Sequence, residues 1–208
     1  MPLPQVAQQN KCITLKGSAA MVRQYLEYGM SNVLYQRGAC PPEHFEQTKY
    51  YGLNLFKATH RKHAEYFAHV LGQIENFLAE KEVASVTLVL INKDTREYLE
   101  NWKFMIDYEE KCSTAAANSY GSKDPQSIQN EISAVVRQIL GTTTVLPLLK
   151  EDKITYEIHA SQRPGVPQWN GWRTVTENTT IANQQTMQFR SFSTSIHSIQ
   201  STVYYKGA

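Results

Sequence analysis

The chain has 208 residues, of which 41% are hydrophobic, and 21 Lys and Arg residues against 19 Asp and Glu residues leave a net charge of +2. This length and composition suffice for one sizeable core and do not require a second domain. The balanced charge argues against phosphate-dominated nucleic-acid binding, and the single basic run, residues 57–63, lacks the aromatic or glycine-rich elements that read bases. We therefore expect one domain and no direct nucleic-acid partner.

The cysteines and the first residues indicate a compartment. Cys12, Cys40 and Cys112 are odd in number and widely spaced, which is typical of reduced thiols rather than of a disulfide framework. The first residues show no basic segment followed by an apolar stretch, and no apolar run reaches about 18 residues. We expect a soluble protein of the cytosol or nucleus, with no membrane partner.

Two amphipathic helices are predicted in the first half of the chain. Apolar residues recur at i, i+3, i+4 and i+7 over residues 18–37, and Gly38 ends this helix before Pro41 and Pro42. A second helix is predicted over residues 60–81, again with one apolar face. The segment between them is predicted to be an irregular arm.

A β-hairpin is predicted after the second helix. Residues 83–91 are almost continuously apolar, as in a strand that is covered on both faces. Residues 98–107 alternate, with Tyr98, Trp102, Phe104 and Ile106 in one phase. The polar residues 111–123 then predict a mobile loop.

A third helix is predicted from Asp124, as N-cap, and Pro125 to a point near Gly141. Arg137 and Gln138 fall outside its apolar stripe. Residues 142–149 predict a strand that Pro147 makes edge-like or bulged, and residues 153–160 predict an alternating strand.

The last part of the chain combines a long loop with a strand-like terminus. The loop, residues 161–186, carries Trp169 and Trp172, and two readings carry equal weight: a binding role, or a strap that buries both rings on the core. In the terminus, residues 187–206, the apolar phase changes between Ile196 and Ile199. Such a change predicts a bulge, a turn or more than one usable register.

Motifs for catalysis or cofactor binding are missing from the sequence. There is no nucleotide-binding glycine loop, no zinc-protease motif and no nucleophile elbow. His60 and His63 stand at i, i+3, but no carboxylate or Cys follows at ligand spacing, and no acid completes a triad with Ser195 and His197. We expect a binding protein without cofactor, metal or catalytic residues.

Six segments, in the same order along the chain, resemble the HORMA domain family and, within it, the spindle-checkpoint branch. They are ITLKGSA (13–19), YGMSNVLYQRG (28–38), ENWKF (100–104), EISAVVRQI (131–139), LPLL (146–149) and FRSFSTSIHSIQSTVYYK (189–206). The resemblance implies an α+β fold in which three long helices pack on a mainly antiparallel sheet. It also implies a core of residues 12–160 and a mobile C-terminal safety belt of residues 161–208.

The same resemblance implies a spindle assembly checkpoint adaptor that switches between open and closed states and entraps a partner peptide beneath its belt. It would thereby inhibit the activator subunit of the anaphase-promoting complex and delay anaphase. The implied partners are this activator, the checkpoint scaffold mitotic arrest deficient one, a second copy in an open–closed homodimer, and a HORMA-remodelling AAA+ ATPase with its adaptor. The implied location is the nucleus and cytoplasm, and kinetochores in mitosis.

The resemblance also implies roles for individual residues, including an ion pair between Arg37 and Glu100. The dimer interface would hold Arg137, Gln138 and Val145, and the conformational switch would use Leu15, Arg37, Phe77 and Glu100. Peptide binding and the belt would use Leu146, Leu148, Ile154, Tyr156, Ile158, Trp169, Phe192, Ile196, His197, Val203 and Tyr205. Candidate phosphorylation sites are Ser195 and Ser201. Phe77 and Val145 stand where the family often has Trp and Phe.

Other functions remain open at this point. A HORMA adaptor can instead serve DNA repair, as an accessory subunit of polymerase zeta does, or assembly of the meiotic axis. A small enzyme is a further alternative from a different class, and turnover that requires His60 or His197 would support it.

Overall fold

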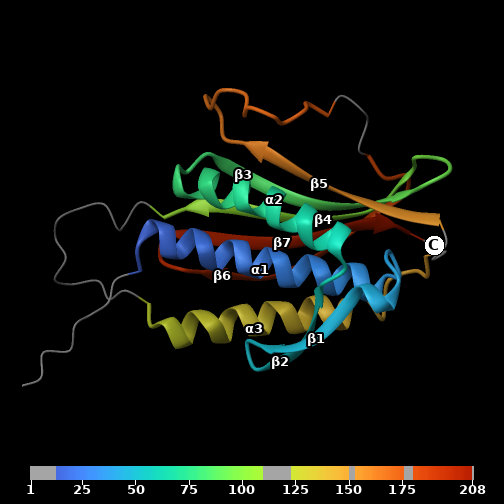
Figure 1. The fold of residues 1–208 in the computed structure, drawn as a ribbon, viewed down its shortest axis with the longest axis horizontal. Coiled ribbons are helices and arrows are strands. Elements are labelled where there is room, and N and C mark those ends of the chain that lie inside the picture. The colour runs from blue at the N-terminus through green and yellow to red at the C-terminus, as the bar shows by residue number, and fades with distance from the viewer. Residues whose placement is uncertain (1–12, 110–122, 150–152, 176–179, 208) are drawn as a thin grey trace, which may run out of the picture.

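The computed structural model describes residues 13–109, 123–149, 153–175 and 180–207 (Figure 1). Helices α1 (Leu15–Gln36), α2 (Arg61–Ala79) and α3 (Pro125–Thr142) cover one face of a five-stranded sheet. The strands are β3 (Val83–Asn92), β4 (Tyr98–Tyr108), β5 (Ile154–Gln162), β6 (Gln184–Ser193) and β7 (His197–Lys206), in the order β5-β3-β4-β7-β6. All neighbours are antiparallel, so the predicted α+β fold is confirmed.

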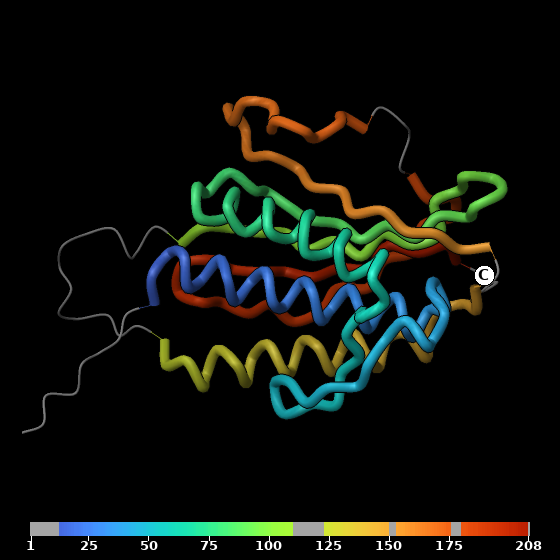
Figure 2. The backbone as a smooth tube through the Cα atoms, in the orientation of Figure 1, coloured from blue at the N-terminus to red at the C-terminus, as the bar shows by residue number. Residues whose placement is uncertain are grey.

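Helix α1 is the centre of the core and lies between α2 and α3 (Figure 2). Its N-cap, Thr14, accepts a hydrogen bond from the Gly17 amide at 3.0 Å. The predicted stop is confirmed, because Gly38 has a φ of 63°, a conformation that glycine adopts without a Cβ clash. Tyr25, Leu26 and ten further residues of α1 are buried, as expected of a helix that is covered on several sides.

The predicted irregular arm after α1 is wrong. A short 3₁₀ helix, η1 (Pro42–His44), leads into a hairpin of β1 (Phe45–Tyr50) and β2 (Leu53–Ala58). Tyr51 and Gly52 turn the chain with φ angles of 50° and 69°. The hairpin has a weak sequence pattern because few of its side chains are buried; instead, Asn32 of α1 bonds the Phe56 main chain at 3.0 Å in both directions.

Helix α3 begins as predicted, since the Asp124 side chain accepts from the Ser127 amide at 3.2 Å. The strand predicted over residues 142–149 is wrong. Thr142 still belongs to α3, and the hydroxyl groups of Thr143 and Thr144 donate to carbonyls of the last helical turn at 2.8 and 2.7 Å. These bonds, together with contacts to Arg37, satisfy the polar groups of the segment without a neighbouring strand.

The β3–β4 hairpin is confirmed, with Leu88 opposite Trp102. Trp102, Phe104 and Ile106 face the helices, as their shared phase predicts. Tyr98 does not join them. An irregularity between Leu90 and Ile91 places Tyr98 opposite Ile91, in a small cluster with Val89 and Ile181 on the other face of the sheet.

The terminal change of phase is a turn between two strands. Strand β6 ends at Ser193, Ser195 turns the chain with a φ of 72°, and β7 begins at His197. Strand β7 then pairs with β4 on one side and with β6 on the other. The terminus is therefore a hairpin whose last strand lies inside the sheet.

Two further expectations meet the structure only in part. The predicted mobile loop of residues 111–123 lies, apart from Lys123, outside the described residues, as do Cys12 and Cys112. Cys40 is a buried free thiol. Within the described ranges, no helix is both long enough and apolar enough to cross a membrane.

Candidate functional site

The candidate site begins with the free edge of β5. This strand pairs with β3 on one side, and no strand of the described residues pairs with its other side. The Ile158 amide at this edge donates to the Tyr66 hydroxyl at 3.2 Å. Because alternate residues of a strand direct their main-chain groups to the same side, the groups in phase with Ile158 are available to an added strand.

Residues 163–175 cross from the end of β5 to α2 and form one wall of the site. We call this segment, with residues 180–183, the belt; it is the part of the expected safety belt, residues 161–208, that precedes the terminal hairpin. The belt is fixed at its start by a hydrogen bond from the Arg163 amide to the Glu82 carbonyl at 2.7 Å. Trp169 stacks on Phe77 with ring centroids 4.1 Å apart and planes at 2°, and its Nε1 donates to Glu82 Oε2 at 2.7 Å.

The strap reading is confirmed for Trp169, and a binding role for the two tryptophans stays a prediction. Trp169 is 6% exposed and packs against the core through Phe77. Trp172 is partly exposed and contacts both rings edge-on, at 6.2 Å from Phe77 and 5.5 Å from Trp169. The strap that anchors the rings is also the wall of a cavity, because both rings line it.

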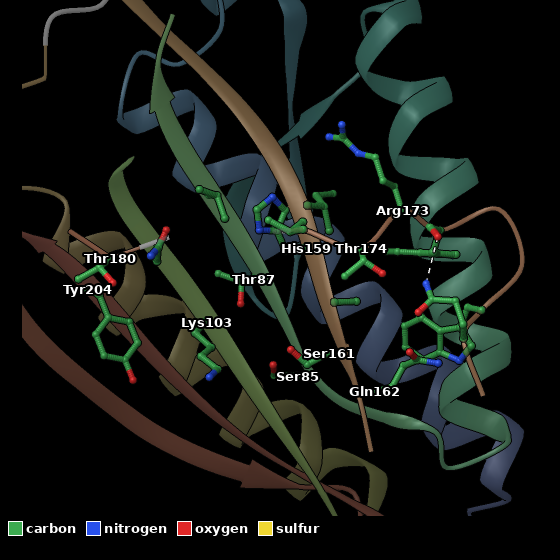
Figure 3. Close-up of a pocket in the computed structure, with 18 of the residues that line it drawn as sticks. Ser85, Thr87, Lys103, His159, Ser161, Gln162, Arg173, Thr174, Thr180 and Tyr204 are labelled. Atoms are coloured by element: carbon green, nitrogen blue, oxygen red, sulfur yellow. Dashed lines mark hydrogen bonds between the residues drawn. The ribbon is translucent and has the colours of Figure 1, made fainter. Parts of the chain in front are cut away.

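A groove of about 610 Å³ runs between the belt and the outer face of the sheet (Figure 3). Ser85 and Thr87 of β3, with Lys103 of β4, form its floor, and Arg173 and Thr174 of the belt lie on its far side. A second hollow of about 300 Å³ lies between β5, α2 and the belt. Ile158 and His159 line both hollows, so together these follow the free edge of β5.

The groove is suited to binding an extended chain. Two of its floor residues, Ser85 and Thr87, are small, which leaves room above them for bulky ligand side chains. The ring of Trp172 lines the groove, and its Nε1 is buried with no hydrogen-bond partner among the described residues. Beside the groove, burial would raise the pKa of Glu157, but hydrogen bonds from His159 and Arg96 outweigh it and lower that pKa. This carboxylate is therefore charged at neutral pH.

The terminal hairpin is fixed on the β4 side of the sheet by a buried hydrogen-bond network. His197 Nδ1 accepts from the Ser18 hydroxyl at 2.5 Å, and its Nε2 donates to the Leu78 carbonyl at 3.3 Å. Thr194 lies 2.5 Å from the same Ser18 oxygen. Burial lowers the pKa of His197, so the imidazole is neutral. The network joins the hairpin to α1 and α2.

The predicted ion pair between Arg37 and Glu100 is confirmed. Two bonds join them, from Nη2 to Oε1 at 2.5 Å and from Nε to Oε2 at 3.2 Å, and the side chains are 4% and 2% exposed. Arg37 also donates to the carbonyls of Thr143 and Pro147, and Trp102 Nε1 donates to Glu100 at 2.9 Å. Burial raises the pKa of Glu100, although Arg37 and Trp102 oppose this.

Comparison with known proteins agrees with this geometry. A family model described as the HORMA domain matches residues 18–197. The chain belongs to the HORMA domain family. The mitotic spindle assembly checkpoint protein MAD2A of Homo sapiens is 34% identical over 196 residues, with 93% of each chain covered. The mitotic spindle checkpoint component mad2 of Schizosaccharomyces pombe is 31% identical over 195 residues, with 93% of this chain and 94% of that one covered.

Solved structures show the same HORMA fold. A chain of the crystal structure of the mitotic checkpoint complex superposes with a TM-score of 0.80 at 28% identity, covering 92% of this chain and 99% of that one. Caenorhabditis elegans HTP-2 bound to the HIM-3 closure motif gives a TM-score of 0.78 at 16% identity, which shows the fold alone. This HORMA protein is MAD2-like, a spindle checkpoint protein and a non-enzymatic adaptor. Its family implies a nuclear and kinetochore role.

The residues expected to bind peptide in this HORMA chain do not all lie at the groove. Trp169 lines the groove. Ile154 and Ile158 are buried, and Tyr156 is half-buried against the core, so β5 offers mainly its main chain to a ligand. The other residues lie elsewhere: Leu146, Phe192, Ile196, His197 and Val203 are buried, Tyr205 is half-buried, and Leu148 is 98% exposed.

Residues expected at a HORMA dimer interface lie on and after α3. Arg137 is exposed, and Val145 is 67% exposed. Gln138 is half-buried, and its Oε1 accepts from the Arg190 amide at 2.8 Å, which ties it to β6. Only the first two therefore offer their full side chains to a partner in this conformation.

The remaining expected residues are split between surface and core. Leu15 is half-buried at the start of α1. Ser195 is half-buried in the turn, where its hydroxyl accepts from the Lys123 amide at 3.3 Å. Ser201 is 1% exposed and bonds the Tyr25 hydroxyl at 2.7 Å, so it is the more deeply buried of the two.

Sequence reasoning did not identify several groove residues. Tyr66 falls within the helix predicted over residues 60–81 and Ser85, Thr87 and Lys103 within the predicted hairpin, but the sequence alone gives none of them a binding role. One signal was available, because Ser85 and Thr87 are polar residues two apart in an otherwise apolar strand. Such spacing places both on the face that the helices do not cover.

Proposed function

We propose that the groove along β5 captures a partner peptide as an added strand, and that this conformation is the closed, ligand-binding state. The observation that carries the proposal is the free edge of β5 beneath the belt, where the Ile158 amide bonds a side chain and not a strand. Main-chain bonds to β5 would supply affinity, and the hollows on both sides would select side chains. The terminal hairpin on β4 leaves this edge accessible.

We further propose a division of labour within the chain. Residues 12–160 serve as the core, and residues 161–208 serve as the safety belt that rearranges between open and closed states. The position of the terminal hairpin supports this division, because it pairs with β4 alone among the other strands, and β4 pairs with β3 and β3 with β5 without contribution from the hairpin. Four core residues would change their contacts when the safety belt rearranges. They are Arg37 and Glu100, which form the ion pair, and Phe77 and Leu15.

The partners we propose follow from the checkpoint role. They are peptides of the checkpoint scaffold mitotic arrest deficient one and of the activator subunit of the anaphase-promoting complex, a second copy through Arg137 and Val145, and a remodelling AAA+ ATPase with its adaptor. Capture of the activator would inhibit the complex and delay anaphase. The protein would act in the nucleus and cytoplasm, and at kinetochores in mitosis. Its similarity to a chain of the mitotic checkpoint complex supports this set.

Slow release of the peptide would depend on Trp169. Its stack on Phe77 contributes about 1 kcal/mol beyond burial, and its hydrogen bond to the Glu82 carboxylate about 1.5–3 kcal/mol. If these contacts break before the belt opens, their loss lowers the barrier by about 2.5–4 kcal/mol, which is about 70- to 1,000-fold in rate.

The experiment measures how fast this protein releases a fluorescently labelled peptide whose sequence is taken from the scaffold partner. Trp169→Ala should release it at least about 70-fold faster than the unmodified chain, whereas Leu148→Ala, a change at a 98% exposed side chain outside the groove, should not alter release. Equal release rates for Trp169→Ala and the unmodified chain would show that the belt does not control release of the peptide.

A further inference from the structure

Three histidines from two parts of the sequence meet beside the start of α2. His44 ends η1, His60 is the N-cap of α2, and His63 lies in its first turn. Their ligand nitrogens all lie within 4.8 Å of one another. The chain has six histidines, so half of them gather at this one point.

The cluster departs from the usual composition of a helix start. An N-cap is normally Ser, Thr, Asp or Asn, whose side chain accepts a backbone hydrogen bond. His60 makes no such bond, and its ring stacks on that of His44 with centroids 3.9 Å apart. A position that breaks a local rule without a structural gain is a candidate for function.

None of the three imidazoles has a carboxylate partner within the part of the chain that the structure describes, so no ion pair competes for their nitrogens. The neutral imidazole is the form that binds metal.

We propose that His44, His60 and His63 bind one zinc ion. His44 Nδ1 and His63 Nε2 are 3.1 Å apart, close to the separation of about 3.3 Å between two nitrogens on a tetrahedral Zn²⁺. The other nitrogen of His63 lies 2.7 Å from the Tyr156 hydroxyl, which gives the ligand an outer partner that fixes its orientation. His60 is exposed, so its ring is free to turn toward the same point.

The donor set excludes the hard cations and suits a transition metal such as zinc. Calcium and magnesium require oxygen ligands, which these residues do not supply. Cys40 Sγ lies 4.0 Å from His63 Nδ1, on the Tyr156 side of the ring and away from Nε2, so it is not a ligand. Three imidazoles therefore leave a fourth position for water or a group from a partner.

Zinc at this point would connect three parts of the fold. His44 belongs to the segment that leads into the β1–β2 hairpin, His60 and His63 begin α2, and Tyr156 belongs to β5. The ion would hold the hairpin against α2 and fix Tyr156 through His63. It would thereby order the strand whose free edge forms the groove.

Calorimetric titration of the full chain with zinc chloride tests the proposal. We expect one equivalent of zinc, and an increase in Tm of about 5–10 °C at zinc concentrations about 100 times Kd. His60→Ala, at an exposed side chain that makes no cap bond, should weaken binding more than about 100-fold, and Tyr156→Phe about 10-fold. His44→Ala should weaken zinc binding by the same factor as His60→Ala.

Three controls separate this site from others. His69→Ala and His159→Ala change histidines outside the cluster and should leave zinc affinity unchanged, and so should Cys40→Ser. Substitution with cobalt should give the visible absorption bands of a tetrahedral site, and these should be lost in His60→Ala. Absence of stoichiometric zinc binding, binding that survives His44→Ala and His60→Ala, or loss of binding in a control variant would each overturn the assignment.

Discussion

Replacing Glu100 by Gln tests the buried ion pair most directly. The change removes the negative charge but keeps a similar shape and an oxygen for Trp102 Nε1. Arg37, whose side chain is 4% exposed, is left as a buried cation with only the carbonyls of Thr143 and Pro147 and one amide oxygen as acceptors. The variant therefore shows what an unpaired guanidinium costs at this position.

The expected cost follows from burial. Removing one partner of a buried pair destabilises a protein by about 3–5 kcal/mol, and the two carbonyl acceptors place Glu100→Gln near the lower value. A loss of about 3 kcal/mol is a large part of a total stability of about 5–15 kcal/mol. For a chain of this length it lowers Tm by about 6–12 °C.

Urea unfolding, followed by far-UV circular dichroism, measures the change as a shift of midpoint at constant slope. The matched control is Glu65→Gln, because Glu65 pairs with Arg61 at 2.8 Å with both side chains exposed. It should lose less than about 0.5 kcal/mol. The double variant Arg37→Met with Glu100→Leu should recover most of the stability, since it removes both charges. A loss for Glu100→Gln no larger than for Glu65→Gln would refute the reasoning.

Three further predictions concern the groove, the dimer surface and pH. Tyr66→Phe removes the acceptor of the Ile158 amide, so peptide association, measured by stopped-flow fluorescence, should accelerate up to about 5-fold. The control Tyr205→Phe loses only the bond to Gln185 and should not change the association rate. Slower association in Tyr66→Phe would contradict this prediction. Arg137→Glu should weaken self-association more than about 10-fold in size-exclusion chromatography with light scattering, without changing peptide release; an equal effect of Lys49→Glu, at another exposed site, would reject a specific interface. Because burial lowers the pKa of His197, the unfolded chain binds more protons below about pH 6.5, so stability is full above that pH and falls as pH decreases. His197→Gln should show a shallower fall in urea titrations across this range, and identical slopes would contradict the argument.

The helices were predictable because their signals are local. The apolar period of α1, α2 and α3, the Asp124 cap and the Gly38 stop all act within a few residues of chain. The β1–β2 hairpin was missed because its stability comes from Asn32, on another element, and not from alternation. Tyr98 was assigned to the wrong face because β4 contains one extra residue, Leu99, between the partners of Leu90 and Ile91, and this bulge resets the alternation.

The candidate site was less predictable, since it depends on contacts between distant segments. Spacing alone showed His60 and His63 but not His44, which the β1–β2 hairpin and η1 bring to them. The composition of the long loop pointed to Trp169 and the resemblance to the Arg37–Glu100 pair, whereas the role of the Ile158 main chain required the strand order. A strand was predicted over residues 142–149 because Thr-rich sequence favours strands. In the structure the hydroxyl groups of Thr143 and Thr144 instead cap α3.

The interior position of β7 has a consequence for biosynthesis. Strands β3, β4 and β5 can pair as soon as residue 162 has left the ribosome, but β4 then keeps one open edge until residues 197–206 follow. Each nascent chain thus passes through a period in which this edge can accept an unrelated strand. Chaperone demand during translation, measured by pausing synthesis before and after β7, should therefore be greatest just before the last strand emerges.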